Sequence, residues 1–394
     1  MEFWMFFFVI VIVLFCLNNY LPNPYDKYMV YFFVFILWFI GGFRYNIGTD
    51  YCLYAQWYED FSNIDLMDND VNREIGFLIL IKILNMFGFD SQVMFLFFET
   101  IIILFAYKGF KFYLNDYNSV MLALCLYTTL KLQASYLGSL NMMRQSMAIS
   151  IVFYASQYIL IGKYFKYAIY LLIAMLFHKS IIIMLCLIPI SRYLKISQKS
   201  SIIIICVSVI ALAFNVGGLI FEKLISLTTN MEMYEGYGEV LANFSIATER
   251  SIHFVEYMIF LLFILLFNAY YSVDRHLKSE IQFVYLMSLT YVCLRIVTCF
   301  STTTSNIVAD VLGTLIHRVD SCFLLFFYCG AAYALKNNIL AGKNKIVFSI
   351  FVFLLCAIMS MKMMYGDYEY AKSSPITLPS MGNYNYEFNF KLIK

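Results

Sequence analysis

The stretch GGFRYNIGTDY, residues 41–51, decides the fold because an apolar run ends there in charged residues. It places Arg44 and Asp50 six residues apart, directly after a segment that can span a membrane. Two glycines can end the preceding helix, and Gly48 gives the backbone freedom between the two charges. Because the neighbouring residues are mostly aromatic or aliphatic, the two charges predict a functional site at a membrane surface. A helix end followed by a stop-transfer charge is the alternative interpretation.

The composition of the whole chain indicates a membrane protein. Of its 394 residues, 62% are hydrophobic and 13% are charged, whereas soluble domains carry about 25% charged residues. No soluble core could bury so much apolar surface, so the sequence predicts an all-α polytopic membrane protein. The net charge of +2, without a basic arm or stripe, gives no reason to expect nucleic-acid binding. The ten cysteines show no metal-ligand spacing, and we expect no metal site and no cofactor.

Charged residues between the apolar segments predict about 12 transmembrane spans within a single integral membrane domain, residues 1–394. Loops that are poor in Lys and Arg tend to face away from the cytoplasm, which places the loops 43–73 and 222–252 and the polar tail 365–394 outside. The apolar segment 74–89 is shorter than the roughly 20 residues that a span needs, so we expect an interfacial or re-entrant helix on the outer face. The expected spans cover residues 3–20, 28–42, 92–107, 119–137, 142–161, 165–193 (two spans), 201–221, 253–272, 280–300, 313–335 and 346–363.

The segment 165–193 can be read as one long span or as two short ones. The basic clusters that follow residues 191, 272 and 335 all face the cytoplasm only if this segment crosses twice. Two crossings place His178 at the tip of a hairpin in the outer membrane face. Irregular backbone at membrane depth is tolerated where it lines a cavity or is buried in protein.

The predicted topology gathers rare charged or titratable side chains at the outer face from five parts of the chain. Charges at membrane depth cost roughly 2.5–3.5 kcal/mol each on insertion scales. A chain therefore keeps several of them only where they pair or bind a ligand. The residues concerned are Arg44, Asp50, Arg144, His178, Lys179, Arg295, His317 and Arg318.

Arg144 is the best placed of these residues. It lies in the first turn of a helix that we expect to start near Asn141, which is a good N-cap candidate. The helix N-terminus already attracts anions, and the planar fork of an arginine suits phosphate oxygens. An outer anchor paired with a loop carboxylate is the alternative. Arg295, inside a predicted span near its outer end, should pair with a carboxylate, line a cavity or snorkel to the interface.

Further candidates come from two helix starts and a loop. His317 and Arg318 start the next inward helix, in the same arrangement as Arg144. An interfacial histidine without a function is the alternative for His317. Glu74 and Asp50 are the carboxylates that we consider as general bases, with an ion pair to a neighbouring arginine as the alternative for each.

An outward-facing cavity lined by arginines and flanked by apolar helices suits a polyprenyl diphosphate that carries a glycan. The apolar spans would hold the lipid tail and the arginines would hold the diphosphate, which leaves readily once its developing charge is stabilised. The sequence contains no Ser-His-Asp order, HExxH motif, P-loop or Gly-rich dinucleotide fingerprint.

Four motifs, taken in order, resemble those of the EpsG-type, Wzy-like polysaccharide polymerases. The stretch FRYNIGTDY at residues 43–51, followed by Tyr54, resembles the first, and EIGF at residues 74–77 resembles a Glu-x-Gly-aromatic segment. NMMRQSMA at 141–148 resembles the start of a helix with an Arg-Gln pair, and AMLFHKS at 174–180 resembles a Phe-His-x-Ser element. Arg318 is a weaker match, and the C-terminal half is matched by hydropathy alone.

The resemblance implies a GT-C-like membrane glycosyltransferase that makes a bacterial surface polysaccharide, such as an O-antigen, exopolysaccharide or capsule. It would move a growing glycan from undecaprenyl diphosphate to an incoming lipid-linked repeat unit at the outer face of the cytoplasmic membrane. A chain-length regulator and a flippase would be partners. Arg44, Arg144, Arg318 and Arg295 would hold the diphosphate, and Asp50 or His178 would orient or deprotonate the acceptor. Tyr51, Glu74, Gln145, Lys179 and His317 would support substrate binding.

Two other functions fit the same composition. A lipid-linked oligosaccharide flippase would need a central cationic cavity open to both faces, usually between two related halves. The charges here gather at one predicted face and no internal repeat is visible, which favours the polymerase. A membrane O-acyltransferase would need a catalytic histidine, for which His178 could serve, but the arginines favour a diphosphate over a thioester.

Overall fold

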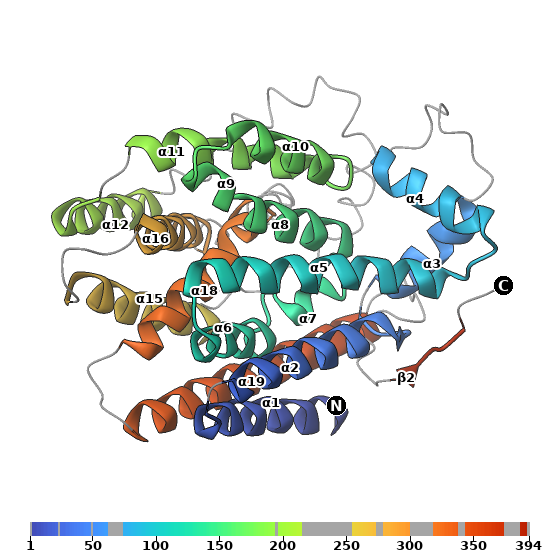
Figure 1. The fold of residues 1–394 in the computed structure, drawn as a ribbon, viewed down its shortest axis with the longest axis horizontal. Coiled ribbons are helices and arrows are strands. Elements are labelled where there is room, and N and C mark those ends of the chain that lie inside the picture. The colour runs from blue at the N-terminus through green and yellow to red at the C-terminus, as the bar shows by residue number, and fades with distance from the viewer. Residues whose placement is uncertain are drawn as a thin grey trace.

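The computed structural model describes a protein built almost entirely of helices (Figure 1). The structure describes residues 2–22, 24–48, 50–61, 74–193, 196–214, 254–272, 279–299, 318–337, 343–373 and 387–391, and the fold and the sites consist of these residues alone.

The chain forms long helices at the ends and in the middle of the sequence, with short helices between them. The N-terminal half contains α1 (Glu2–Tyr20), α2 (Tyr25–Gly42), α3 (Tyr51–Asp60), α4 (Ile75–Met86), α5 (Ser91–Leu114), α6 (Tyr117–Thr129), α7 (Tyr136–Ser139), α8 (Met143–Ala155) and α9 (Gln157–Leu160). They are followed by α10 (Tyr164–Met175), the 3₁₀ helix η1 (Lys179–Cys186), α11 (Leu187–Tyr193) and α12 (Gln198–Ala213). The C-terminal half contains α15 (Phe254–Ser272), α16 (Ser279–Cys299), the 3₁₀ helix η3 (Ser321–Phe323), α18 (Leu324–Lys336) and α19 (Lys343–Ser373).

The lengths and apolar composition of these helices are those of a multi-pass membrane protein. In the described part of the chain, five helices are long and apolar enough to cross a membrane: Glu2–Tyr20, Ser91–Leu114, Ser279–Val297, Arg318–Lys336 and Asn344–Gly366. Four shorter apolar helices accompany them. The expected all-α membrane class is confirmed. The expected number of about 12 spans goes beyond what these helices establish.

Helices α5 and α18 form the centre of the packing. Helix α5 packs against α2, α6 and α8, and α18 packs against α6, α15 and α16. Figure 1 shows α5 running across the middle of the molecule, with α3 and α4 gathered at the end where α5 begins. Glycine permits the close approach of α5 to α8, because a Cβ atom at Gly109 would lie only 2.4 Å from the Phe153 ring.

One predicted span, residues 119–137, is wrong as a single helix, because α6 ends at Thr129. The chain then turns, and Ser135 caps the short helix α7 by accepting a hydrogen bond from the Gly138 amide. A Cβ atom at Gly138 would lie 2.0 Å from the Leu132 carbonyl oxygen, so only glycine allows this turn. Hydropathy alone does not reveal the break, because the turn residues are themselves buried.

The segment 165–193 folds back on itself, as the two-span prediction requires. The Tyr167 hydroxyl of α10 donates to the Met184 carbonyl of η1 at 2.6 Å, and the Arg192 Nε of α11 donates to the Tyr164 hydroxyl at 3.1 Å. The two halves are therefore antiparallel, and His178 lies in the connection between them.

The C-terminal segment returns to the stretch with which the sequence analysis began. Helix α19 continues to Ser373, beyond the predicted end of the span at residue 363. Strand β2 (Glu387–Phe388) then pairs antiparallel with strand β1 (Arg44–Tyr45), placing Arg44 opposite Phe388. The Asn389 amide donates to the Phe43 carbonyl at 2.9 Å, so residues 387–389 lie beside residues 43–45.

Candidate functional site

Four side chains from four segments meet at the end of the bundle where α4 lies. We call Glu74, Arg144, His178 and Arg318 the Arg144 cluster. As predicted, Arg144 lies in the first turn of α8, and it forms an ion pair with Glu74, the N-cap residue of α4. His178 lies within electrostatic range of Glu74, Arg318 and Arg144.

Aromatic rings fix the plane of the Arg144 guanidinium. Its central carbon lies 5.1 Å from the ring centre of Phe77 and 5.4 Å from that of Trp57, both within cation–π range. The side chain is 14% exposed and Glu74 is 15% exposed, so this ion pair borders the surface of the protein. A guanidinium held in this way presents a fixed set of N–H groups to an anion.

A glycine joins the Glu74 segment to the His178 segment. The Gly76 amide donates to the Leu176 carbonyl at 2.8 Å. A Cβ atom at Gly76 would lie 2.7 Å from the same oxygen, so a larger residue would push the two segments apart. The spacing of Glu74 and Gly76 in the sequence therefore has a structural reason, which is to set the carboxylate beside the histidine.

His178 is mostly buried in the connection between α10 and η1. Its Nδ1 lies 2.8 Å from the Ser180 hydroxyl. A neutral imidazole has one nitrogen that can accept a proton.

Gln145 and Lys179, two further residues predicted to support substrate binding, lie near the Arg144 cluster. The Gln145 amide donates to the Arg318 carbonyl at 2.9 Å and so ties the start of α8 to the segment that precedes α18. Lys179 is exposed at the rim of an apolar groove of about 580 Å³. The groove runs between α4 and α10 and is lined by Glu74, Ile75, Ile169, Leu172, Ile173, Met175, Leu176 and Lys179.

Asp50 and Arg295 lie in a second, more polar cavity of about 380 Å³. Arg295 pairs there with two carboxylates, Asp320 and Glu256, each at 3.1 Å. The sequence predicted that Arg295 pairs with a carboxylate, lines a cavity or snorkels to the interface. The structure shows the first two of these roles. Neither carboxylate was among the sequence candidates, although Glu256 is an acidic residue at the start of an apolar helix, which is a usable signal.

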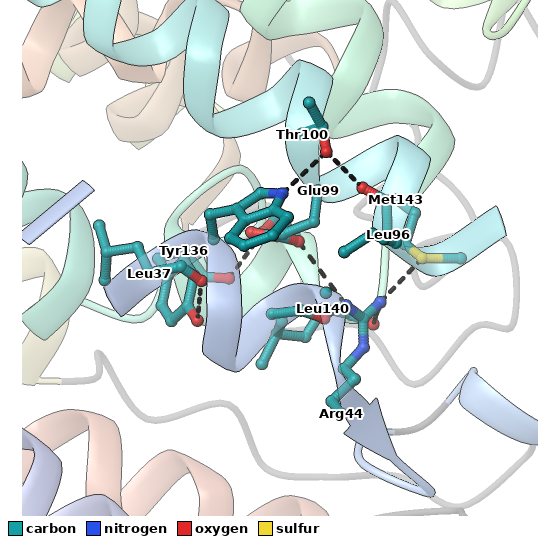
Figure 2. A network of polar contacts seen from close by, with 12 residues as sticks. Leu37, Arg44, Leu96, Glu99, Thr100, Tyr136, Leu140 and Met143 are labelled. Atoms are coloured by element: carbon teal, nitrogen blue, oxygen red, sulfur yellow. Dashed lines mark hydrogen bonds and ion pairs between the residues drawn. The ribbon is translucent and has the colours of Figure 1, made fainter. Parts of the chain in front are cut away.

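Arg44 takes no part in either cavity. It is fully buried, and its guanidinium lies 3.6 Å from the Glu99 carboxylate and donates to the carbonyls of Gly41 and Leu140 (Figure 2). The Met143 sulfur, one residue before Arg144, is a further contact at 2.8 Å. Glu99 escaped the sequence analysis, and the signal that could have found it is a single carboxylate within the apolar run 92–107.

Tyr51 and Gly48 have packing roles. The Tyr51 ring stacks on Phe95 with centres 4.4 Å apart, and its hydroxyl donates to the Gln92 side chain at 3.3 Å. Gly48 has a φ of +94°, and a Cβ atom there would lie 2.0 Å from Asn141 Oδ1. The prediction of Asn141 as the N-cap is wrong, because the N-cap of α8 is Met142, whose side chain makes no capping hydrogen bond. His317 lies outside the described residues.

The fold defines a multi-pass α-helical membrane protein, and charged side chains line two of its cavities. The chain matches the EpsG family over residues 27–387 and belongs to that family. This finding confirms the family that the four motifs indicated and extends the match over the C-terminal half. No curated protein and no solved structure matches the chain. Membership of the EpsG family points to polysaccharide biosynthesis.

Proposed function

We propose that this protein is a surface-polysaccharide polymerase that transfers a growing glycan from undecaprenyl diphosphate to an incoming lipid-linked repeat unit. The observation that carries the proposal is the ion pair between Arg144 and Glu74, because Glu74 also lines the apolar groove beside α4 and α10. A polyprenyl chain can lie against Ile169, Leu172 and Ile173 in the groove, while its diphosphate reaches the two arginines and Lys179. Membership of the EpsG family supports the same reading.

The proposed reaction is a displacement at the anomeric carbon of the donor glycan. The acceptor hydroxyl oxygen forms a bond to this carbon, and the bond from the carbon to the diphosphate oxygen breaks. The diphosphate leaves with the electron pair, and Arg144 and Arg318 stabilise the charge that develops on it. Glu74 and two aromatic rings fix the Arg144 side chain before substrate binds, and the Gln145 bond to its carbonyl holds the backbone of Arg318.

The proton of the acceptor hydroxyl goes to one of two residues. His178 belongs to the Arg144 cluster, whereas Asp50 lines the second cavity. A base must reach the reacting hydroxyl, so replacing it lowers kcat and alters the pH profile, while replacing the other residue changes substrate affinity. His178→Gln and Asp50→Asn, compared over a range of pH, separate the two roles.

The orientation of the protein is part of the proposal. We place it in the bacterial cytoplasmic membrane with about 12 spans in one GT-C-like membrane domain and with the Arg144 cluster facing outward. The antiparallel fold of residues 165–193 supports this topology, because it places Arg192 at the opposite end of the hairpin from His178. A flippase that supplies the repeat unit and a chain-length regulator would act with it.

The experiment that tests the function is deletion of the gene, followed by analysis of lipid-linked and surface glycans on a ladder gel. Loss of a polymerase leaves single repeat units on the lipid and at the surface. Loss of a flippase leaves lipid-linked units that never reach the outer face, and this outcome would overturn the proposal.

Two substitutions refine this test. Arg144→Ala and His178→Ala should reach the membrane in normal amounts yet give single repeat units. Arg192→Ala is a matched control, because Arg192 also contacts a tyrosine but lies at the other end of the hairpin. If both variants of the cluster still make long chains, the site is wrongly assigned.

A further inference from the structure

The second cavity differs in chemistry from the Arg144 cluster. Its volume of about 380 Å³ lies within the range of small-molecule sites, which is roughly 300–1,000 Å³. Asp50, Lys131, Arg295 and Asp320 line it, so cations and carboxylates are equal in number. Charges of both signs around one cavity give no net attraction for a diphosphate.

Arg295 is held in a way that withdraws its charge from any ligand. Its Nη1 lies 3.1 Å from Asp320 and its Nη2 lies 3.1 Å from Glu256. The two carboxylate side chains are 3% and 5% exposed, so the three groups form a buried network with an excess of negative charge. Arg295 therefore shapes the wall of the cavity and positions Asp320.

The remaining lining offers neutral hydrogen-bonding groups beside apolar surfaces. The Ser321 hydroxyl donates to the Gln133 side chain at 3.0 Å, and the amide of Asn141 lies in the same lining. Amides and hydroxyls both donate and accept hydrogen bonds, as the hydroxyls of a sugar require. Tyr291 and Met142 add apolar surface for the C–H face of a sugar ring.

The cavity shares two walls with the Arg144 cluster. Asn141 and Met142 directly precede the first turn of α8 that carries Arg144. On the other wall, Asp320 and Ser321 follow Arg318 within one helical turn, and Gln145 ties this segment to α8 at 2.9 Å. A ligand in the cavity therefore lies next to a ligand held by the cluster.

We propose that the second cavity binds the acceptor, a neutral terminal sugar of the incoming repeat unit, while the Arg144 cluster binds the donor diphosphate. This inference rests on the polymerase function. Asp50 lines the cavity and so lies on the acceptor side, where its carboxylate can receive the proton of the attacking hydroxyl. In this proposal the Arg144 cluster binds the lipid diphosphate through cationic side chains. The second cavity binds the sugar through neutral hydrogen-bonding groups.

The test measures binding of lipid-free oligosaccharide to the purified full-length protein in nanodiscs. The probe is the glycan released by mild acid from the lipid-linked pool of the deletion strain. Gln133→Leu and Ser321→Ala should each weaken its binding about tenfold, as expected for a lost hydrogen bond to a buried polar group. Gln157→Leu is the matched control, because Gln157 is also a half-buried glutamine with a side-chain hydrogen bond, here to the Tyr154 carbonyl, but does not line the cavity.

The outcomes separate the cavity from the function. Arg144→Met should bind the oligosaccharide as the unsubstituted protein does, and equal thermal unfolding temperatures show that the cavity variants are folded. If the protein polymerises lipid-linked units but Gln133→Leu and Ser321→Ala bind the oligosaccharide normally, the acceptor site is overturned and the polymerase stands. If the protein does not polymerise them, the function fails, whereas oligosaccharide binding that is lost in the cavity variants still supports a sugar site.

Discussion

Arg44 and Arg144 are both paired with a glutamate from a distant part of the chain, yet they lie in opposite environments. Arg44 and Glu99 are 0% exposed, and backbone carbonyls surround the guanidinium (Figure 2). Arg144 and Glu74 are 14% and 15% exposed beside an open apolar groove. An arginine in a membrane protein can therefore hold the bundle together or face a ligand, and its burial and partners distinguish the two roles.

The largest predicted effect comes from removing the charge of Arg44. Arg44→Met leaves Glu99 buried without its partner, and breaking a buried ion pair costs about 3–5 kcal/mol in the free energy of unfolding. Thermal unfolding in detergent micelles measures this loss. The double variant Arg44→Met/Glu99→Leu should recover much of the stability, because it leaves no unpaired buried charge. A single variant as stable as the unsubstituted protein would remove the contrast with Arg144.

A smaller effect is expected where the Glu74 segment contacts the His178 segment. Gly76→Ala places a Cβ atom 2.7 Å from the Leu176 carbonyl oxygen, so one backbone must move. Overpacking of this kind costs about 1–3 kcal/mol and should reduce polymerisation more than stability, because it separates Glu74 from His178. Gly366→Ala is the control, since no atom lies within 4 Å of a Cβ atom there. Equal activity of the two variants would show that the contact is dispensable.

Arg144→Met should change the free energy of unfolding by about 1 kcal/mol or less, because its ion pair borders the surface. The same substitution should abolish chain growth. Unfolding in micelles and a glycan ladder, measured on the same variant, give the two quantities. A loss of stability as large as that of Arg44→Met would place both arginines in the same structural class.

The smallest effect is expected at the C-terminal segment that pairs with β1. Lys391 forms an ion pair with Asp90 at 3.3 Å, and its side chain is 63% exposed. Lys391→Ala should change stability by less than about 1 kcal/mol, and added salt should reduce the difference further. A large, salt-independent loss would show that this segment is essential for holding Arg44 in its buried site.

The sequence predicted the helical class well, because long apolar runs have few other solutions in a membrane. It failed at the end of α6, since the turn depends on the Ser135 cap and on the space that Gly138 leaves. These are contacts between buried residues, and hydropathy does not distinguish them from a continuous helix.

The sequence predicted which residues lie near one another where motifs marked them. It did not predict the ion-pair partners of buried arginines. The order of motifs suggested that Glu74, Arg144 and His178 belong together, and their contacts agree. The structural role of Arg44 depends on its ion pair with Glu99, a carboxylate from α5 that no motif marks. The fate of Arg295 depends on two carboxylates 39 and 25 residues away in the chain. Such pairings require the packed structure.

The most direct test of the central claim is the affinity of the purified protein in nanodiscs for undecaprenyl diphosphate, with undecaprenol as the comparison. We predict that the unsubstituted protein prefers the diphosphate and that Arg144→Met loses this preference, while Arg192→Ala retains it. An Arg144→Met protein that still prefers the diphosphate as strongly as the unsubstituted one would contradict the assignment of the Arg144 cluster as the diphosphate site.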